Sequence, residues 1–158
     1  MSYFRQTANY QISISESSVS TQTIQSAANI DITNSTISYT PHLNSIKVVY
    51  EGSFYLTTTY RMYCAINLLE YINGTWSEVN SNSRQTFYTN QYGYGNTDEH
   101  VVYVKYMINP WQGEKSFKLR LNNRSSAWNA RLHRTDKWEG STGTDAYIMP
   151  QFMMYSVL

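Results

Sequence analysis

Apolar and polar side chains alternate with a period of two from Asn29 to the end of the chain, and this pattern restricts the possible folds most strongly. Segment 45–56 is the clearest case, with Ile46, Val48, Tyr50, Phe54 and Leu56 on one face and Lys47, Glu51 and Ser53 on the other. Successive side chains of a β-strand point to opposite faces. No window keeps the helical spacing of apolar residues for three turns. The sequence therefore predicts an all-β fold.

The same pattern gives the positions of the strands. They are expected at residues 30–32, 36–39, 45–56, 60–72, 76–79, 85–88, 101–108, 116–121, 128–132 and 147–158. The first two should pair with each other around Thr33–Ser35, and Asn73-Gly74 is a strong hairpin signal because both residue types tolerate positive φ. Alternation places Ile46 and Ile72 inward and His133 outward. Eight to ten strands at this spacing indicate a sandwich or a barrel.

Composition narrows the class further. A chain of 158 residues favours one domain, and its 15% aromatic and 15% charged residues do not fit a disordered protein. No apolar run is long enough for a transmembrane helix, and residues 1–6 lack the apolar core of a signal peptide. The net charge of +1 argues against nucleic acid and membrane insertion as partners.

Residues 1–28 differ from the rest because they are polar, with scattered apolar side chains. They are expected to form either a linker or a short N-terminal arm that docks on a partner, with the sandwich or barrel domain at 29–158. The anchors of such an arm would be Tyr3, Phe4, Tyr10, Ile12 and Ile14. The even spacing of the last three suggests a strand added to the sheet edge of another protein.

The last predicted strand, 147–158, is apolar on both faces. One face of a sandwich strand meets the core, so the other must be covered by a loop of the same chain or by another subunit. A subunit interface is the favoured interpretation. Its expected residues are Tyr147, Met149, Phe152, Met153 and Tyr155.

Residues with catalytic or metal-binding chemistry do not form a recognisable motif. His42, His100 and His133 lack metal-ligand spacing, and the carboxylates are dispersed. Cys64 lies on an inward position and is expected to act as a small buried hydrophobe. The sequence thus predicts no enzyme, no metal site and no cofactor.

A ligand or partner surface is suggested by aromatic and basic residues. Tyr92, Tyr94, Trp111 and Trp138 fall in predicted loops, where they could anchor a protein, stack on a sugar or pack within the chain. Arg131 and Arg134 belong to a basic region in which Lys118, Arg120 and Arg131 should lie on neighbouring strands. That stripe is either a solvated face or a surface for an anionic partner.

Three segments resemble a jelly-roll domain common in tailed bacteriophages, marine ones especially. They are Ser38-Tyr39-Thr40-Pro41 with Asn44-Ser45-Ile46-Lys47-Val48, then Tyr106-Met107-Ile108-Asn109-Pro110, and Ser116-Phe117-Lys118-Leu119-Arg120. The resemblance covers about 30–158 and departs at Asn109, where an aspartate is usual. The family is similar in outline to the C1q and tumour-necrosis-factor jelly rolls, which form trimers.

The resemblance implies an antiparallel jelly-roll β-sandwich that assembles as a homotrimer in a virion. A capsid decoration protein or small head appendage, attached by its N-terminal arm to other virion proteins, is the favoured function. The alternatives are a receptor-binding tip of a tail fibre and a lectin-like module, both of which would bind host surface glycan.

Overall fold

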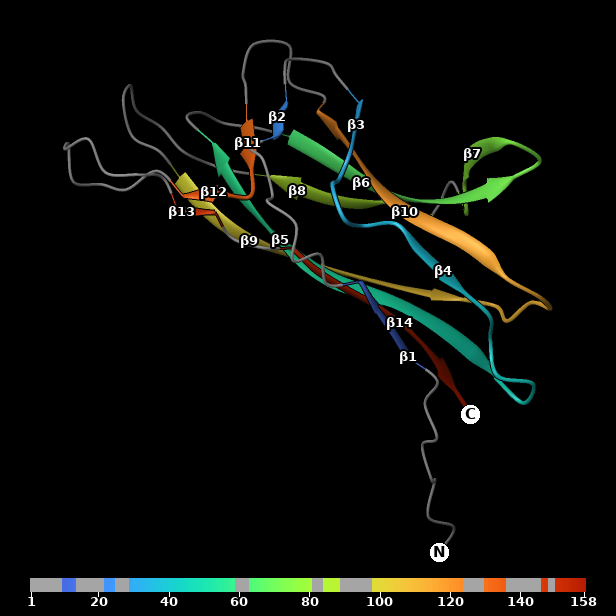
Figure 1. Cartoon of the computed structure of the whole chain (residues 1–158). Helices are drawn as coiled ribbons and strands as arrows, with labels where there is room; N and C mark the ends of the chain where they lie inside the picture. The colour runs from blue at the N-terminus through green and yellow to red at the C-terminus, as the bar shows by residue number, and fades with distance from the viewer. Residues whose placement is uncertain are drawn as a thin grey trace, which may run out of the picture.

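Two facing antiparallel sheets contain most of the strands in the described part of the chain (Figure 1). The computed structural model describes residues 10–13, 22–24, 29–58, 63–80, 84–88, 98–123, 130–135, 146–147 and 150–158. Within these ranges every regular element is a strand, and every strand pair is antiparallel. The all-β prediction is confirmed.

Sheet A is built around its longest strand, β5. Its strands are β1 (Tyr10–Ser13), β2 (Gln22–Ile24), β5 (Lys47–Thr58), β9 (Asp98–Ile108), β11 (Ala130–Leu132) and β14 (Gln151–Val157). Strand β9 follows β5 along its whole length on one side. On the other side, β14 pairs with the first half of β5 and β11 with the second half.

Sheet B is built around β10 and β6. Its strands are β3 (Asn29–Asp31), β4 (Ile37–Tyr39), β6 (Tyr63–Ile72), β7 (Thr75–Glu78), β8 (Gln85–Tyr88) and β10 (Lys115–Asn123). Strands β3 and β4 follow one another along the outer edge of β10, and β7 and β8 do so along β6. A separate small pair joins β12 (Arg134–Thr135) to β13 (Ala146–Tyr147).

The order of the strands is that of a jelly roll. Sheet A contains β1, β14, β5 and β9 as neighbours, and sheet B contains β4, β10, β6 and β7 or β8. The chain crosses from one sheet to the other between β4 and β5, between β5 and β6, between β8 and β9, and between β9 and β10. After β10 it returns to sheet A, where it ends in β14. The predicted jelly-roll β-sandwich is thus confirmed, although short strand pieces share positions and raise the number of strands above the expected eight to ten.

The core lies between the two sheets and contains the side chains that alternation placed inward. Among them are Val48, Tyr50, Phe54, Leu56, Cys64, Ile66, Leu68, Val102, Val104, Tyr106, Phe117, Leu119, Leu121, Leu132, Phe152 and Met154. The hairpin at Asn73-Gly74 is also confirmed, because both residues have positive φ and join β6 to β7.

Buried tyrosines connect the two layers through hydrogen bonds. The Tyr50 hydroxyl donates to the carbonyl of Ser35 (2.5 Å), and the Tyr106 hydroxyl donates to the carbonyl of Ile66 (2.8 Å). The Tyr39 hydroxyl bonds the Ser156 hydroxyl at 2.8 Å. Each tyrosine fills the core with its ring and satisfies a polar group across the layers. This arrangement explains part of the high tyrosine content.

Two expectations about the N-terminal third of the chain are wrong. Strands β3 and β4 do not pair with each other; both pair with β10, because Asn34 at positive φ and Ser35 continue the chain along that edge. Residues 10–13 and 22–24, assigned to a free arm, pair with β14 and β11 of the same sheet. A boundary at Asn29 therefore divides segments that share sheet A.

Three further predictions need correction. The strand expected at 147–158 is two strands, β13 and β14, with Pro150 before the second. His133 is buried, because its positive φ of 65° interrupts the alternation after Leu132. Ile46 (64% exposed) and Ile72 (44%) face solvent, since they lie where β5 begins and β6 ends.

Candidate functional site

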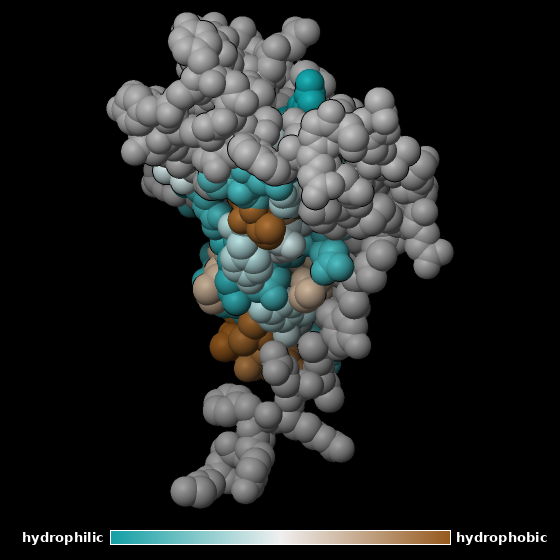
Figure 2. Space-filling model, turned by 90° about the vertical axis from the view of Figure 1, so that its left-hand side faces the viewer, coloured by the Kyte–Doolittle hydropathy of each residue, from teal (hydrophilic) through white to brown (hydrophobic). Residues whose placement is uncertain are grey.

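Among the strands in the described ranges, the outer face of sheet A carries the apolar side chains with the highest exposed fractions. On β9, Val101 is 69% exposed, Tyr103 59% and Met107 64%. Strand register places Met107 and Tyr155 on either side of Val49. We call Val101, Tyr103, Met107, Met153 and Tyr155 the assembly face. Figure 2 shows hydrophobic surface in separate patches with hydrophilic surface between them.

A polar network occupies the centre of the assembly face. The Glu51 carboxylate accepts a hydrogen bond from the Tyr103 hydroxyl (2.9 Å) and forms an ion pair with Lys105 (3.0 Å). The Lys105 ammonium also lies 3.5 Å from the Tyr155 hydroxyl. Burial raises the pKa of Glu51, but the hydrogen bonds from Lys105 and Tyr103 outweigh it and lower that pKa overall. The carboxylate therefore stays ionised and paired at neutral pH.

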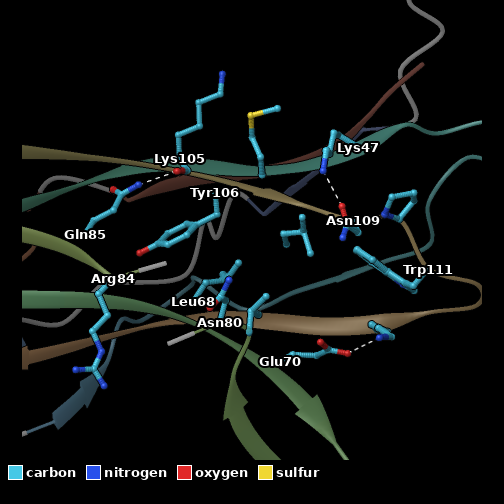
Figure 3. Close-up of a pocket in the computed structure, with 15 residues that line it drawn as sticks. Lys47, Leu68, Glu70, Asn80, Arg84, Gln85, Lys105, Tyr106, Asn109 and Trp111 are labelled. Carbon is cyan, nitrogen blue, oxygen red and sulfur yellow. Dashed lines mark hydrogen bonds and ion pairs between the residues drawn. The ribbon is translucent and has the colours of Figure 1, made fainter. Parts of the chain in front are cut away.

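A cleft of about 720 Å³ opens beside this face. It lies between the C-terminal part of β9 on one side and β6 with the residues that follow β7 on the other. Figure 3 shows Tyr106, Leu68 and Trp111 directed between the sheets, whereas Lys105 points away from the cleft. The apolar part of the lining comes from Leu68, Val79, Met107, Ile108, Pro110 and Trp111. Its polar part includes Asn80, Gln85 and Asn109.

Charged side chains on the rim of the cleft are paired in different ways. Lys115 forms an ion pair with Glu70 at 2.6 Å, and its ammonium lies 5.7 Å from the centre of the Trp111 ring. Arg84 pairs with Glu78 outside the lining. Lys47 instead donates to the amide oxygen of Asn109 at 2.6 Å, so its partner is neutral.

Segments 38–48, 106–110 and 116–120 meet around Trp111 at the end of the cleft. The Trp111 ring centre lies 4.9 Å from that of Phe117 and 6.3 Å from that of Tyr39. Ser156 of β14 accepts from the backbone N–H of His42 at 3.0 Å and so holds the loop after β4. These segments build one end of the sandwich, which gives them a structural role.

The predicted interface residues divide between the two faces of β14. Phe152 is 1% exposed and lies in the core, so its assignment to an interface is wrong. Met153 and Tyr155 are half-buried on the opposite face, as alternation requires. Tyr147 lies in β13. Met149 lies outside the described residues.

The predicted arm and ligand residues are only partly described. Tyr10 and Ile12 lie in β1, where they pair with Tyr155 and Met153. Trp111 lines the cleft, Arg131 lies half-buried in β11, and Arg134 lies in β12. Residues outside the described ranges are Tyr3, Phe4, Ile14, Tyr92, Tyr94 and Trp138.

The predicted basic stripe is wrong. Lys118 and Arg120 lie on β10 of sheet B, whereas Arg131 lies on β11 of sheet A. Both β10 cations bind Asp31, at 2.5 and 2.7 Å. Strands that follow one another in the sequence of a sandwich often enter different sheets, which alternation does not reveal.

Burial keeps two of the described titratable groups uncharged at neutral pH. Burial raises the pKa of the Cys64 thiol to about 12, so the thiol stays protonated and unreactive at neutral pH. Burial lowers the pKa of His133 to about 4. No group of three or more potential metal ligands occurs among the residues that were described.

Comparisons with solved structures give similarity at a low level. No known protein family matches the sequence, and no curated protein does. A chain in the structure of the infectious bursal disease virus Gt strain is similar with a TM-score of 0.49 and 11% identity. The alignment covers 97% of this chain but 38% of the viral chain. In the described ranges, no helix is long and apolar enough to cross a membrane.

Proposed function

We propose that this chain is a non-enzymatic structural component of a virus particle and that it assembles as a homotrimer through the assembly face. The observation that carries the proposal is the exposure of Val101, Tyr103 and Met107, each more than half exposed on one face of β9. Exposed apolar patches that are bordered by polar residues mark interaction sites. Met153 and Tyr155 extend this surface onto β14.

The polar groups of the assembly face are suited to burial against another copy. Glu51 and Lys105 neutralise each other, and the hydroxyls of Tyr103 and Tyr155 bond to that pair. A partner that covers the face would therefore not leave a single charge unpaired, which is the costly case in an interface. The pair also gives the centre of this face no net charge of its own.

A closed trimer requires contacts between two different surfaces of each copy, because the interfaces of a three-fold ring are heterologous. The assembly face would be one of them. The trimeric state and the virion location are supported by the jelly-roll strand order together with the resemblance of segments 38–48, 106–110 and 116–120 to the phage domain. Within that assignment, a capsid decoration protein or head appendage is the favoured role.

Attachment to other virion proteins is assigned to the residues before β1. Tyr3 and Phe4 are the proposed contacts, because Tyr10 and Ile12 are already paired with β14. Three copies of a weak contact on one trimer would multiply its strength through effective concentration. Deleting residues 1–9 should thus weaken attachment to particles and leave the mass of the assembly unchanged.

The proposal is tested by the mass of the intact protein in solution. Multi-angle light scattering at micromolar concentration should give about three times the chain mass of 18.4 kDa. A single species at 18.4 kDa would contradict the assembly, and a dimer would contradict the three-fold arrangement.

A further inference from the structure

We propose that the cleft between β9 and β6 binds an acidic saccharide, meaning a sugar that carries a carboxylate or a sulfate. The cleft borders the assembly face at Met107, but Leu68 and Trp111 line it from between the sheets (Figure 3). The inference goes beyond the structural role above and does not depend on it.

The size of the cleft sets the first limit on its ligand. Its volume of about 720 Å³ falls within the range of sites for small organic molecules. An inorganic anion would leave most of this space filled with water. A ligand that fills it needs several rings or an equivalent extended body.

The apolar part of the lining favours a ligand with one nonpolar side. Ile108, Pro110 and Trp111 provide partly exposed aliphatic and aromatic surface, and Trp111 is held in place by Phe117 and Tyr39. A fixed aromatic ring loses little conformational entropy when a ligand packs on it. The nonpolar face of a pyranose ring matches such a surface.

The polar part of the lining excludes a purely apolar ligand. The side-chain amides of Gln85 and Asn109 line the same space. Gln85 donates to the Lys105 carbonyl at 2.7 Å and Asn109 accepts from Lys47 at 2.6 Å, so each amide keeps further donor and acceptor capacity. Amides both donate and accept, as do sugar hydroxyls. Hydroxyl groups along one edge of a sugar therefore match these residues.

The charge of the rim selects an acidic sugar over a neutral one. Lys105, Lys115 and Arg84 each form an ion pair with a carboxylate, whereas the partner of Lys47 is the neutral amide of Asn109. A ligand carboxylate or sulfate beside Lys47 would gain a charge-assisted hydrogen bond. A single cation of this kind does not suit a nucleic acid, which needs several phosphate contacts.

The test is calorimetric titration with trigalacturonic acid and sialyllactose as acidic probes and maltotriose as the neutral probe. At least one acidic probe should bind the full-length protein about tenfold more tightly than maltotriose, the order of effect expected for one charge-assisted hydrogen bond. Binding of neither acidic probe, or equal affinity for all three sugars, would overturn the proposal.

Two matched variants locate the site. Lys47→Gln keeps a side chain that can bond Asn109 but removes the charge, so it should weaken binding of the acidic probe about tenfold and leave maltotriose unaffected. Lys118→Gln removes a cation on β10 that does not line the cleft, and it should leave both affinities unchanged. Equal losses in the two variants would show that binding follows net charge and would contradict the assignment to the cleft.

Discussion

Single residues determine how the two layers are held together and where alternation breaks. Tyr50 and Tyr106 each place a hydroxyl across the core, and burial raises the pKa of both phenols. They therefore act as neutral donors at all physiological pH values. Burial also keeps His133 neutral, but in this case it lowers the pKa, so the imidazole resists protonation. The sequence pattern showed that Tyr50 and Tyr106 face inward, but their partners 15 and 40 residues away depend on the fold.

The buried imidazole of His133 predicts a stability that depends on pH. Burial lowers its pKa to about 4, below the ordinary value of about 6.5, so the unfolded chain binds a proton that the folded chain refuses. Stability is therefore complete above about pH 6.5 and decreases as the pH falls toward 4. At pH 5 the loss should be on the order of 2 kcal/mol.

Urea unfolding at pH 7 and pH 5 checks this prediction. His133→Asn should remove most of the difference, because asparagine does not titrate and tolerates the positive φ at this position. His42→Asn serves as the control and should keep the wild-type pH dependence. If His133→Asn remains as sensitive to acid as the wild type, another group causes the effect.

At the scale of elements, the sequence pattern predicted the inner faces of the long strands more reliably than their partners. Alternation identified the buried residues of β5, β9 and β10, since a half-buried strand must have a period of two. It could not show that β3 and β4 both pair with β10, or that β10 and β11 belong to different sheets. Pairing depends on contacts between distant segments, which local periodicity does not contain.

The candidate site was less predictable than the fold for the same reason. Met153 and Tyr155 were expected on a covered face, and the structure places them beside Met107 of β9 through the intervening β5. The cleft joins Lys47, Leu68 and Trp111 from three separate regions of the chain. Only Trp111 had a local signal, as an aromatic residue in a predicted loop.

The pairing of β5 with β14 depends on the absence of a side chain at Gly52. This residue lies opposite Phe152, and an added Cβ would overlap the Gln151 carbonyl oxygen and the Phe152 ring. Gly52→Ala should therefore lower the free energy of unfolding by about 1–3 kcal/mol, the usual effect of overpacking. The adjacent change Ser53→Ala should alter it by less than about 0.5 kcal/mol. Chemical denaturation of both variants measures the difference, and equal effects would mean that the register is not as described.

At the scale of the whole molecule, the two proposed sites have different positions and different chemistry. The assembly face is an apolar surface with an internally neutralised centre, and the cleft is a mixed cavity with Lys47 at its rim. A trimer would present three clefts on one particle component. Binding of the proposed acidic saccharide would then gain strength from multivalency.

The central claim is that the assembly face joins copies of this chain, and sedimentation velocity of Met107→Lys beside the wild type tests it most directly. Met107 is 64% exposed, so lysine is tolerated in the free chain but places an unpaired charge inside the proposed interface. Ile72→Lys is the control, because Ile72 is also exposed but lies on β6 of sheet B. We expect Met107→Lys to sediment as a monomer and Ile72→Lys to sediment as the wild-type trimer. An intact trimer in Met107→Lys would contradict the claim that this face holds the assembly together.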